Sequence, residues 1–486
     1  MKIPEDSMDI TIIARDIHGT DLDPHVFDSA QIPVAPEALA DLCGAVDGAD
    51  LAAPPVVLPD FHHKSTMEIP SSVAVATRGS IRPTLTSASV NCGMTLMAFD
   101  TDRPSRAAIE QFYRRVRERF PYPPGRRTEL SAHDVLSCAT EGAPFAARRF
   151  GIEAPNLERV EEYGALDLDR WDGADRLRRE LPALVLQLAR LRFGTVGPTN
   201  HFIEMQEVEE ILDPDKAAKL GVAQGQLTLH YHAGGGVLPG AVGAMFGRRK
   251  HHPREIRMAM SVVKPLYHGL SARNLAQLKE RYRLFFAGGC PPVALNTDEG
   301  RRLMLANAAA MNYGFAFRLA IYAGLRQIAS DVFGGSPPAL IVDSPHNSIY
   351  EEHVAGQSAI VHRHNSCRAY PAEQMPPGTT FAETGQAVLV PGTHRTSSYL
   401  CVGAGSAAAL NSACHGAGTV VSDFARRGVS RADPRCRSTL RFRYDGAAPT
   451  DAEQLDDAGV NEVLGVLVRG GLVRPVARMR PIAVLH

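Results

Sequence analysis

A long apolar periodicity in residues 297–333 is the feature that most limits how this chain can fold. Apolar residues recur there every three or four positions, which is the spacing of one face of an α-helix. Residues 105–120, 174–192 and 272–286 show the same spacing. We therefore predict four clear helices, the longest of them over residues 297–333.

Short β-branched or alternating runs that end in glycine or proline lie between these helices, as is typical of strands. The predicted strands cover residues 72–77, 95–100, 226–232, 257–263, 339–342, 359–362, 387–391, 399–402, 439–444 and 481–485. Their irregular spacing favours an α+β fold, with a large mixed or antiparallel sheet surrounded by helices, over a regular alternation of strand and helix.

The domain organisation is predicted to be simple. With 486 residues, 44% hydrophobic and 22% charged, the composition is that of a soluble globular enzyme. We find no internal repeat and no low-complexity linker. We expect an N-terminal segment over residues 1–57, a catalytic domain over residues 58–486, and a helical insertion around residues 153–192.

Charge, cysteine content and hydropathy argue against a strongly basic nucleic-acid-binding domain, a disulfide-rich protein and a membrane-spanning protein. The formal net charge of −1 gives no global attraction to nucleic acid, so any such contact must be local. Arginine-rich stretches at residues 114–119 and 248–254 are candidates, and a solvated surface is the competing interpretation. The eight cysteines form no CxxC pair and no apolar run is long enough to span a membrane, so we expect a reducing, cytoplasmic setting without a membrane.

Two histidines and three glycines mark one candidate site. His230 and His232 are two positions apart on a predicted strand, so both side chains point to the same face. Either could bind a metal, although a structural histidine is the more common case. The glycines at residues 234–236 would let a ligand approach the backbone, and a loose turn is the alternative.

A second candidate site lies at residues 411–418, where small residues lead into an apolar-patterned helix over residues 419–426. Free backbone amides and the positive end of the helix dipole would bind phosphate there. His415 stands beside this turn, and a neutral imidazole is a competent nucleophile towards phosphorus. A plain helix cap is the competing interpretation.

Cys92 follows a strand-like run and precedes a glycine. A buried free thiol is the usual role of such a cysteine. A thiolate combined with imidazoles would instead suit a borderline or soft ion such as Zn²⁺, in an open catalytic site rather than a closed structural one.

Taken in order, these segments resemble the RtcB family of tRNA-splicing RNA ligases over roughly residues 58–486. The blocks that carry the resemblance are PDFHHK at residues 59–64 with NCGM at 91–94, GPTNHFIE at 197–204, PHN at 345–347, VHR at 361–363, and PG at 391–392 through SY at 398–399 with CHGAG at 414–418. Each block is weak alone, whereas the ordered set is specific.

The resemblance implies a site and an activity. Cys92 would bridge two divalent ions, usually manganese, with His201, His232 and His346 as the other ligands. His415 would carry GMP taken from GTP, and pass it to RNA with broken ends so that a 3′-phosphate or 2′,3′-cyclic phosphate end is joined to a 5′-hydroxyl end. The nucleotide would contact Asn200, His201, Glu204, His346, Asn347, Pro391, Gly392, Thr393, His394, Ser398, His415, Gly416, Ala417, Gly418 and His486. An activating protein partner and a monomer or weak oligomer are also expected.

This chain departs from the family pattern at several positions. Ser89 stands where the family has an aspartate ligand, so one ion should bind more weakly. Gly235 and Gly236 replace a serine–arginine pair, and His364 replaces a lysine, so fewer phosphate contacts are expected. His486 corresponds to a near-terminal lysine that contacts the guanine nucleotide, which leaves the choice of nucleotide open.

Two other functions fit the same residues. A metal-dependent phosphatase or nuclease could use the cysteine and histidines to activate water without a nucleotide. A non-catalytic RNA- or nucleotide-binding paralogue is compatible with the missing carboxylate and basic residues. RNA repair and tRNA splicing are both open as the process served.

Overall fold

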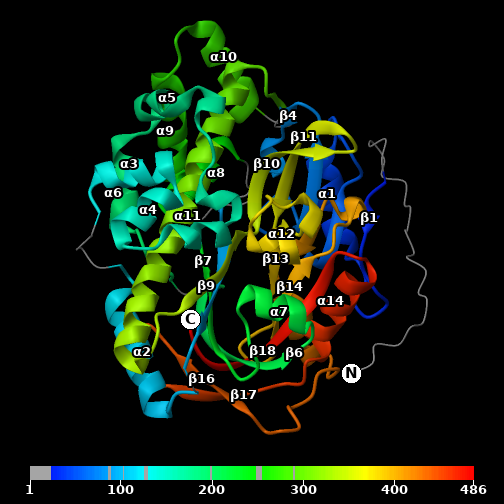
Figure 1. Ribbon diagram of the computed structural model, residues 1–486. Coiled ribbons are helices and arrows are strands. Elements are labelled where there is room, and N and C mark those ends of the chain that lie inside the picture. The colour runs from blue at the N-terminus through cyan, green and yellow to red at the C-terminus, as the bar shows by residue number, and fades with distance from the viewer. Residues whose placement is uncertain are drawn as a thin grey trace.

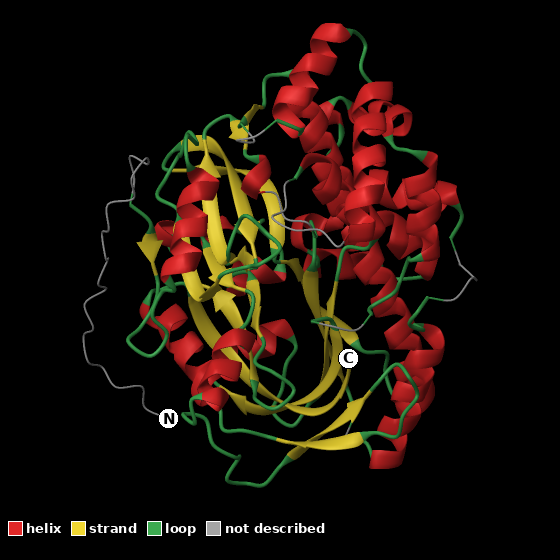
Figure 2. Cartoon of the chain, turned by 180° about the vertical axis from the view of Figure 1, so that it is seen from behind, coloured by secondary structure: helices red, strands yellow, loops and turns green. Residues whose placement is uncertain are grey.

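The computed structural model describes residues 23–85, 89–101, 103–124, 130–197, 200–247, 254–287 and 291–486. Most helices gather on one side of the molecule and the strands on the other (Figure 1, Figure 2). The combination of helices with mixed and antiparallel sheets confirms the predicted α+β class. Among the described helices, none has the length and apolar composition that a membrane crossing requires.

The larger sheet has the strand order β13-β14-β18-β6-β7-β5-β9, and β16 joins it by pairing with β18 and β17. All of these pairs are antiparallel except β16 with β18. The strands are β5 (Gly93–Phe99), β6 (Phe202–Ile211), β7 (Leu227–Ala233), β9 (Ala339–Pro345), β13 (Ala387–Val390), β14 (Ser398–Gly403), β16 (Ser438–Phe442), β17 (Thr450–Glu453) and β18 (Val473–Leu485).

A second sheet has the order β1-β2-β3-β11-β10, and two short pairs, β12 with β15 and β4 with β8, lie outside it. Strand β9 ends one residue before His346 and β10 begins one residue after it, so the chain passes from the first sheet to the second at this histidine. The strands are β1 (His25–Val26), β2 (Val56–His62), β3 (Ser71–Thr77), β4 (Ser80–Ile81), β8 (Val293–Ala294), β10 (Asn347–Val354), β11 (Gln357–His364), β12 (Ser366–Arg368) and β15 (Ser412–Cys414).

Helix α11 forms the centre of the helical layer and is buried along most of its 36 residues. It packs on α2, α3, α4 and α8. The helices are α1 (Pro36–Val46), α2 (Arg106–Arg119), α3 (Ala132–Glu141), α4 (Ala143–Phe150), α5 (Gly173–Glu180), α6 (Ala183–Leu191), α7 (Pro214–Leu220), α8 (Val237–Phe246), α9 (Arg254–Leu270), α10 (Leu275–Phe285), α11 (Asp298–Phe333), α12 (Thr380–Thr384), α13 (Gly418–Arg426) and α14 (Ala458–Arg469).

Side chains alternate between the two faces of the larger sheet, and this alternation places the histidines of β7. Leu229 and Tyr231 face the helices, where the Tyr231 hydroxyl donates to the Arg318 carbonyl oxygen of α11 at 2.9 Å. His230 and His232 therefore face the opposite way. A separate apolar cluster from β5, β9, β13 and β14 covers that second face.

Two predictions about individual elements are wrong. The strand predicted over residues 257–263 is part of α9, because apolar residues also recur at every fourth position from Met258 to Leu270 and this helical repeat prevails. The single helix predicted over residues 174–192 is divided into α5 and α6. Pro182 stands at the start of α6, where its missing amide proton costs no hydrogen bond.

A buried carboxylate ties together strands around the second sheet. Glu352 of β10 accepts from Arg363 Nη1 and Nη2 of β11, at 2.6 and 2.9 Å, and from Arg368 Nε of β12 at 2.8 Å. Burial opposes ionisation of Glu352, but the charges of Arg363 and Arg368 outweigh it and lower its pKa to about 2. The carboxylate is therefore charged at neutral pH.

The substitution Glu352→Gln should lower the free energy of unfolding at pH 7 by about 3–5 kcal/mol, because the buried guanidinium groups of Arg363 and Arg368 lose the carboxylate that they share, although Arg368 keeps its ion pair with Glu162. A carboxylate with a lowered pKa stabilises the fold above its unfolded pKa of 4.5 and loses this effect as the pH falls towards 2. In urea titrations, the difference in the free energy of unfolding between wild type and variant should therefore decrease as the pH falls from 4.5 to 2. A difference that is constant with pH would contradict this ion-pair role.

Candidate active site

Side chains predicted as metal ligands come from neighbouring strands of the larger sheet. Cys92 directly precedes β5, His201 directly precedes β6, His232 lies in β7 and His346 follows β9. The strands β6, β7, β5 and β9 are consecutive in the sheet, so residues far apart in the sequence meet at one end of it. The backbone fixes the alignment, since the His346 amide donates to the Cys92 carbonyl oxygen at 2.8 Å.

Three of these side chains lie within reach of a single metal ion. Cys92 Sγ is 3.2 Å from His232 Nε2, which is 2.9 Å from His346 Nε2. The ligand atoms of the three residues all lie within 4.8 Å of one another. His201 stands beside them, with its Nε2 3.6 Å from Cys92 Sγ. Zinc binds nitrogen at about 2.0 Å and sulfur at about 2.3 Å, so the spacing fits an ion of this size.

Hydrogen bonding and burial prepare this cluster for a cation. His232 Nδ1 donates to the Asn200 carbonyl oxygen at 2.8 Å, so the lone pair of Nε2 faces Cys92. Burial lowers the pKa of His232 and of His346, and both rings are neutral. Burial raises the pKa of the Cys92 thiol to about 11, although Arg318 opposes this rise. A metal cation would supply the positive charge that a buried thiolate needs.

An arginine from α11 holds the turn that carries Cys92. Arg318 is fully buried and contacts both carboxylate oxygens of Asp343 on β9, at 2.7 and 2.8 Å. Its Nη1 also donates to Asn91 Oδ1 at 2.8 Å, and Asn91 has the left-handed backbone conformation with φ 57°. This role of Arg318 could not be predicted from the sequence, because the residue spacing of a long buried helix does not distinguish one arginine from the others.

The glycines after His232 are packed tightly. A Cβ on Gly234 would lie 3.0 Å from His201 Cε1, and a Cβ on Gly235 would lie 2.6 Å from the Val90 carbonyl oxygen. These contacts favour the interpretation that the glycines allow close approach at the site over that of a loose turn.

His415 lies against the candidate metal ligands. Its ring centroid is 4.5 Å from that of His346 and 6.5 Å from that of His232. It stands between β15 and α13, at the predicted opening of a helix. Its Nδ1 donates to the Asn365 carbonyl oxygen at 3.1 Å, which leaves the lone pair on Nε2. Burial, with a smaller effect from Lys64, lowers the pKa of His415 to about 3, so the imidazole is neutral at pH 7.

Protein groups already occupy part of the predicted phosphate site. The Val420 amide donates to Asp60 Oδ1 at 3.0 Å, and Thr419 donates to the same carboxylate. The Ala417 amide donates to the Pro391 carbonyl oxygen at 2.9 Å. The prediction of free amides is therefore wrong at these three positions. Asp60 caps α13, a role that the sequence did not reveal although Asp60 lies in one of the quoted blocks.

Some predicted nucleotide-binding residues form a hydrogen-bonded chain. Gln206 Nε2 donates to Glu204 Oε1 at 2.6 Å and to Ser398 Oγ at 3.1 Å. The Gly392 amide in turn donates to Ser398 Oγ at 3.3 Å. Burial raises the pKa of Glu204 to about 7. The structure therefore brings together Glu204, Ser398 and Gly392, and adds Gln206, which the sequence analysis did not name.

The other predicted nucleotide-binding residues occupy separate contacts. Asn347 Nδ2 donates to the Ser89 carbonyl oxygen at 3.1 Å, and its Oδ1 accepts from the Asn365 amide at 2.8 Å. This asparagine therefore joins the loop before Cys92 to the loop that holds His415.

A turn and a histidine pair lie further along the chain. The Thr393 amide donates to Thr396 Oγ1 at 2.9 Å. The rings of His394 and His486 are 5.4 Å apart, and Arg441 Nη2 lies 2.8 Å from His486 Nε2. The end of β18 thus meets the turn after β13.

Two arginines of the first arginine-rich stretch make contacts within the protein. On α2, Arg115 pairs with Asp331 at 3.0 Å and Arg117 donates to the Arg443 carbonyl oxygen at 3.1 Å, so these two make structural contacts. Residues 248–253 of the second stretch lie outside the described residues.

A family model described as tRNA-splicing ligase RtcB matches residues 49–486. The chain belongs to the RtcB family. This confirms the resemblance drawn from the ordered blocks, and the matched range includes Cys92, His232, His346 and His415.

Individual relatives differ in how much of their length the match covers. The tRNA-splicing ligase RtcB of Pyrococcus horikoshii is 30% identical over 422 residues, which are 81% of this chain and 44% of that protein. The RNA-splicing ligase RtcB of Mycobacterium tuberculosis is 31% identical over 359 residues, 71% of this chain and 74% of the relative. The tRNA-splicing ligase RtcB of Thermococcus kodakarensis is 28% identical over 464 residues, 88% and 86% respectively. This RtcB-family chain thus spans less than half of the Pyrococcus horikoshii relative.

Cys92→Ala should lower the affinity for Mn²⁺ or Zn²⁺ by at least about tenfold, because one of the three clustered side chains that could hold the ion is lost. Calorimetric titration of metal-stripped protein, with elemental analysis of the bound metal, measures the change. Cys138→Ala removes an equally buried thiol from α3 and should leave the affinity unchanged. Equal affinities for Cys92→Ala and wild type would show that the thiol is not a ligand.

Proposed function

We propose that this chain is an RNA ligase that joins a 3′-phosphate or 2′,3′-cyclic phosphate end of RNA to a 5′-hydroxyl end, in RNA repair or tRNA splicing. The observation that carries the proposal is the position of His415, whose ring lies 4.5 Å from that of His346 and beside the Cys92 cluster. A nucleophile for phosphorus next to metal-binding side chains suits nucleotide transfer. The names of the relatives, tRNA-splicing and RNA-splicing ligase, agree with it.

Three displacements at phosphorus account for the reaction. His415 Nε2 attacks the α-phosphorus of GTP, so that an N–P bond forms and pyrophosphate leaves. The RNA 3′-phosphate then takes GMP from the histidine. The 5′-hydroxyl of the second strand attacks the activated 3′-phosphorus and releases GMP. A cyclic phosphate end is first opened by water to a 3′-phosphate.

The surroundings of His415 support its role as the nucleophile. Its neutral ring offers an unprotonated Nε2 at pH 7. The Asn365 carbonyl oxygen, which accepts from Nδ1 at 3.1 Å, orients the ring and stabilises the positive charge that the imidazole gains when Nε2 attacks.

Cys92, His232 and His346 would hold one metal ion, and His201 is the adjacent ligand. When bound, a divalent ion neutralises phosphate charge and stabilises charge on the leaving oxygen. We propose Mn²⁺, the usual ion of the family, and Zn²⁺ is the alternative, since it also suits a thiolate and imidazoles. Ser89 leaves a second ion with one carboxylate fewer than the family pattern provides.

GTP is the proposed nucleotide. When ionised, Glu204 accepts hydrogen bonds only, and guanine offers adjacent N–H donors on one edge, so the ionised form of Glu204 suits guanine better than adenine. Its position in the chain from Gln206 to Ser398 and Gly392 supports this assignment. The remaining assigned nucleotide contacts are Asn200, His201, His346, Asn347, Pro391, Thr393, His394, Gly416, Ala417, Gly418 and His486.

The proposal extends to the setting of the enzyme. RNA with broken ends is the substrate, the compartment is the cytoplasm, and an activating protein partner belongs to the same proposal. We also propose that the chain is divided into an N-terminal segment, residues 1–57, and a catalytic domain, residues 58–486, with a helical insertion around residues 153–192.

Incubation with GTP labelled at the α-phosphorus should transfer the label covalently to the protein, and ATP should transfer much less. His415→Ala should abolish the transfer, because the attacking nitrogen is lost. His353→Ala, at the end of β10, changes a histidine outside the site and should retain it. Mass spectrometry locates the label.

Other results of this assay would reject the ligase proposal. A phosphatase or nuclease would act on RNA ends without GTP and without a labelled intermediate. A non-catalytic paralogue would bind RNA or nucleotide equally well with and without His415. Absence of covalent label from both nucleotides, in protein loaded with Mn²⁺, would therefore exclude the histidine–GMP route.

A further inference from the structure

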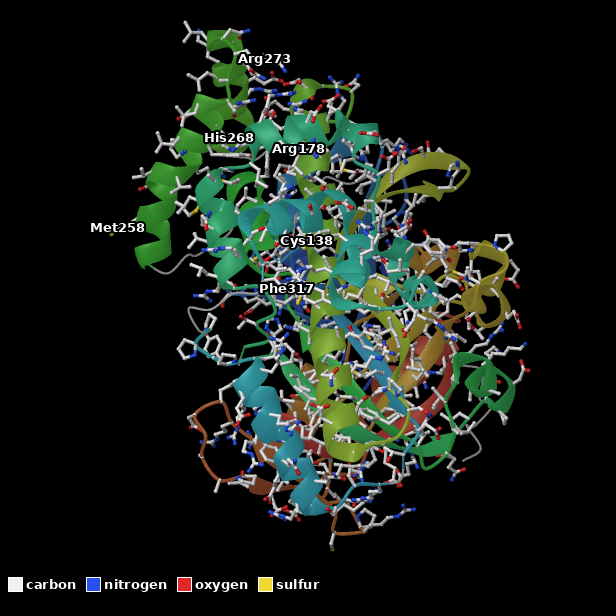
Figure 3. All side chains as sticks on the ribbon, turned by 60° about the vertical axis from the view of Figure 1, so that its left-hand side comes forward. Cys138, Arg178, Met258, His268, Arg273 and Phe317 are labelled. Atoms are coloured by element: carbon white, nitrogen blue, oxygen red, sulfur yellow. The ribbon has the colours of Figure 1, made fainter. Side chains whose placement is uncertain are left out.

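An apolar surface lies on the outside of the helical layer. Among the described residues, eleven of the fifteen exposed large apolar side chains are on α6, α9 and α10. On α9 they follow the helical repeat, with exposed fractions of 64% at Met258, 58% at Val262, 53% at Leu266 and 83% at Leu270. Figure 3 shows Met258 at the outer edge of the molecule, pointing away from the helices behind α9.

Buried charged groups hold the inner sides of α9 and α10 against α11. Arg281 Nε of α10 contacts Glu299 Oε1 of α11 at 2.6 Å, and Arg302 Nη1 of α11 lies 3.1 Å from His268 Nδ1 of α9. Arg281 and Arg302 are each 1% exposed. A surface helix usually buries its apolar face and exposes its charges. On α9 and α10 charged groups lie inside together with apolar side chains, and the outer face of α9 is nevertheless apolar as well, so this outer face has the composition expected of a buried surface.

The same face carries a hollow. Val263 of α9 and Leu184 of α6 stand at its rim, and Leu238 and Met245 of α8 contribute to its lining. Its volume is about 90 Å³, and its lining is almost entirely apolar. One face therefore offers both protruding side chains and a hollow that could receive an apolar side chain.

Charge decides which partner fits. From Met258 to Leu270 the exposed face of α9 carries no exposed charged side chain among the described residues. Lys264 is half-buried, with its Nζ 5.4 Å from the ring centroid of Phe286. An acidic protein or an anionic membrane would find little to pair with on this stripe. A second copy of the chain could meet it without opposing like charges, since two-fold contacts press the same patch against itself.

The size of the surface also suits a second copy. A monomeric protein seldom exposes a contiguous apolar patch above about 300–600 Å². A stable dimer buries about 800 Å² on each partner. The eight exposed apolar side chains of α6 and α9 are between 38% and 83% exposed, which gives a patch on the order of that required by a dimer.

We propose that the outer face of α6 and α9, which carries no exposed charged side chain among the described residues, is a two-fold interface with a second copy of this chain, in which apolar side chains of α9 from each copy pack into the hollow beside α6 of the other. The interface is independent of the proposed ligase reaction, because its residues lie on the helical layer whereas His415 lies on the opposite face of the larger sheet.

Analytical ultracentrifugation of the full chain over a wide range of concentration tests this proposal. Wild type should sediment as a dimer that dissociates on dilution. The double substitution Val262→Glu and Leu266→Glu should raise the dissociation constant by about a hundredfold or more, because a two-fold axis brings the new charges together. Leu212→Glu, at a leucine 40% exposed beyond the end of β6, should leave it unchanged. Circular dichroism melting establishes that each variant is folded.

Three outcomes would overturn the proposal. Wild type could sediment as a monomer at every concentration. The folded double variant could dimerise as strongly as wild type. A monomeric wild type could bind vesicles of anionic phospholipid through this face, with loss of binding in the double variant, which would assign the surface to a lipid instead.

Discussion

The buried ion pair between Arg318 and Asp343 is the contact on which the rest of this structure depends. Removing two charges from water costs several kcal/mol for each ion, and only good geometry offsets that cost. The guanidinium donates hydrogen bonds to both carboxylate oxygens of Asp343 and a further one to Asn91. One side chain thereby fixes the long helix α11 to strand β9 and to the turn before Cys92. Loss of either Arg318 or Asp343 would leave the other as an unpaired buried charge beside the turn that carries Cys92.

Alternation along the strands then separates two environments. The face of the larger sheet towards α11 is an apolar core that includes Tyr231, whereas the opposite face carries His230 and His232. Strand order completes the site, because β6, β7, β5 and β9 are neighbours although they are distant in the sequence. A metal-binding cluster can therefore form from single residues at strand ends, each held by backbone pairing, without a local sequence motif of its own.

The sequence predicts the parts of this fold that local spacing determines. Helix α11 begins and ends within one residue of the prediction, because its apolar repeat has only one interpretation over that length. Residues 257–263 satisfy the strand and helix repeats equally, and only tertiary packing selects α9. Cys92 and His346 lie in the ordered blocks that carry the resemblance, whereas His232 is a candidate because of the strand alternation and the glycines that follow it. The roles of Asp60 and Arg318 could not be found in this way, because each depends on a partner more than twenty residues away in the sequence.

Ser89 changes the electrostatic character of the centre more than its geometry. A divalent ion held by the Cys92 thiolate and neutral imidazoles would keep about one unit of positive charge, and the buried guanidinium of Arg318 lies nearby. In a centre with two ions, an aspartate at position 89 would cancel one further unit of positive charge. The residual charge would favour anionic groups, and the proposed reaction brings two of them to the site, the phosphates of a nucleotide and of an RNA end. The missing carboxylate would thus weaken the binding of one ion without adding negative charge beside the other, so that a centre with a single ion would still offer positive charge to the phosphates.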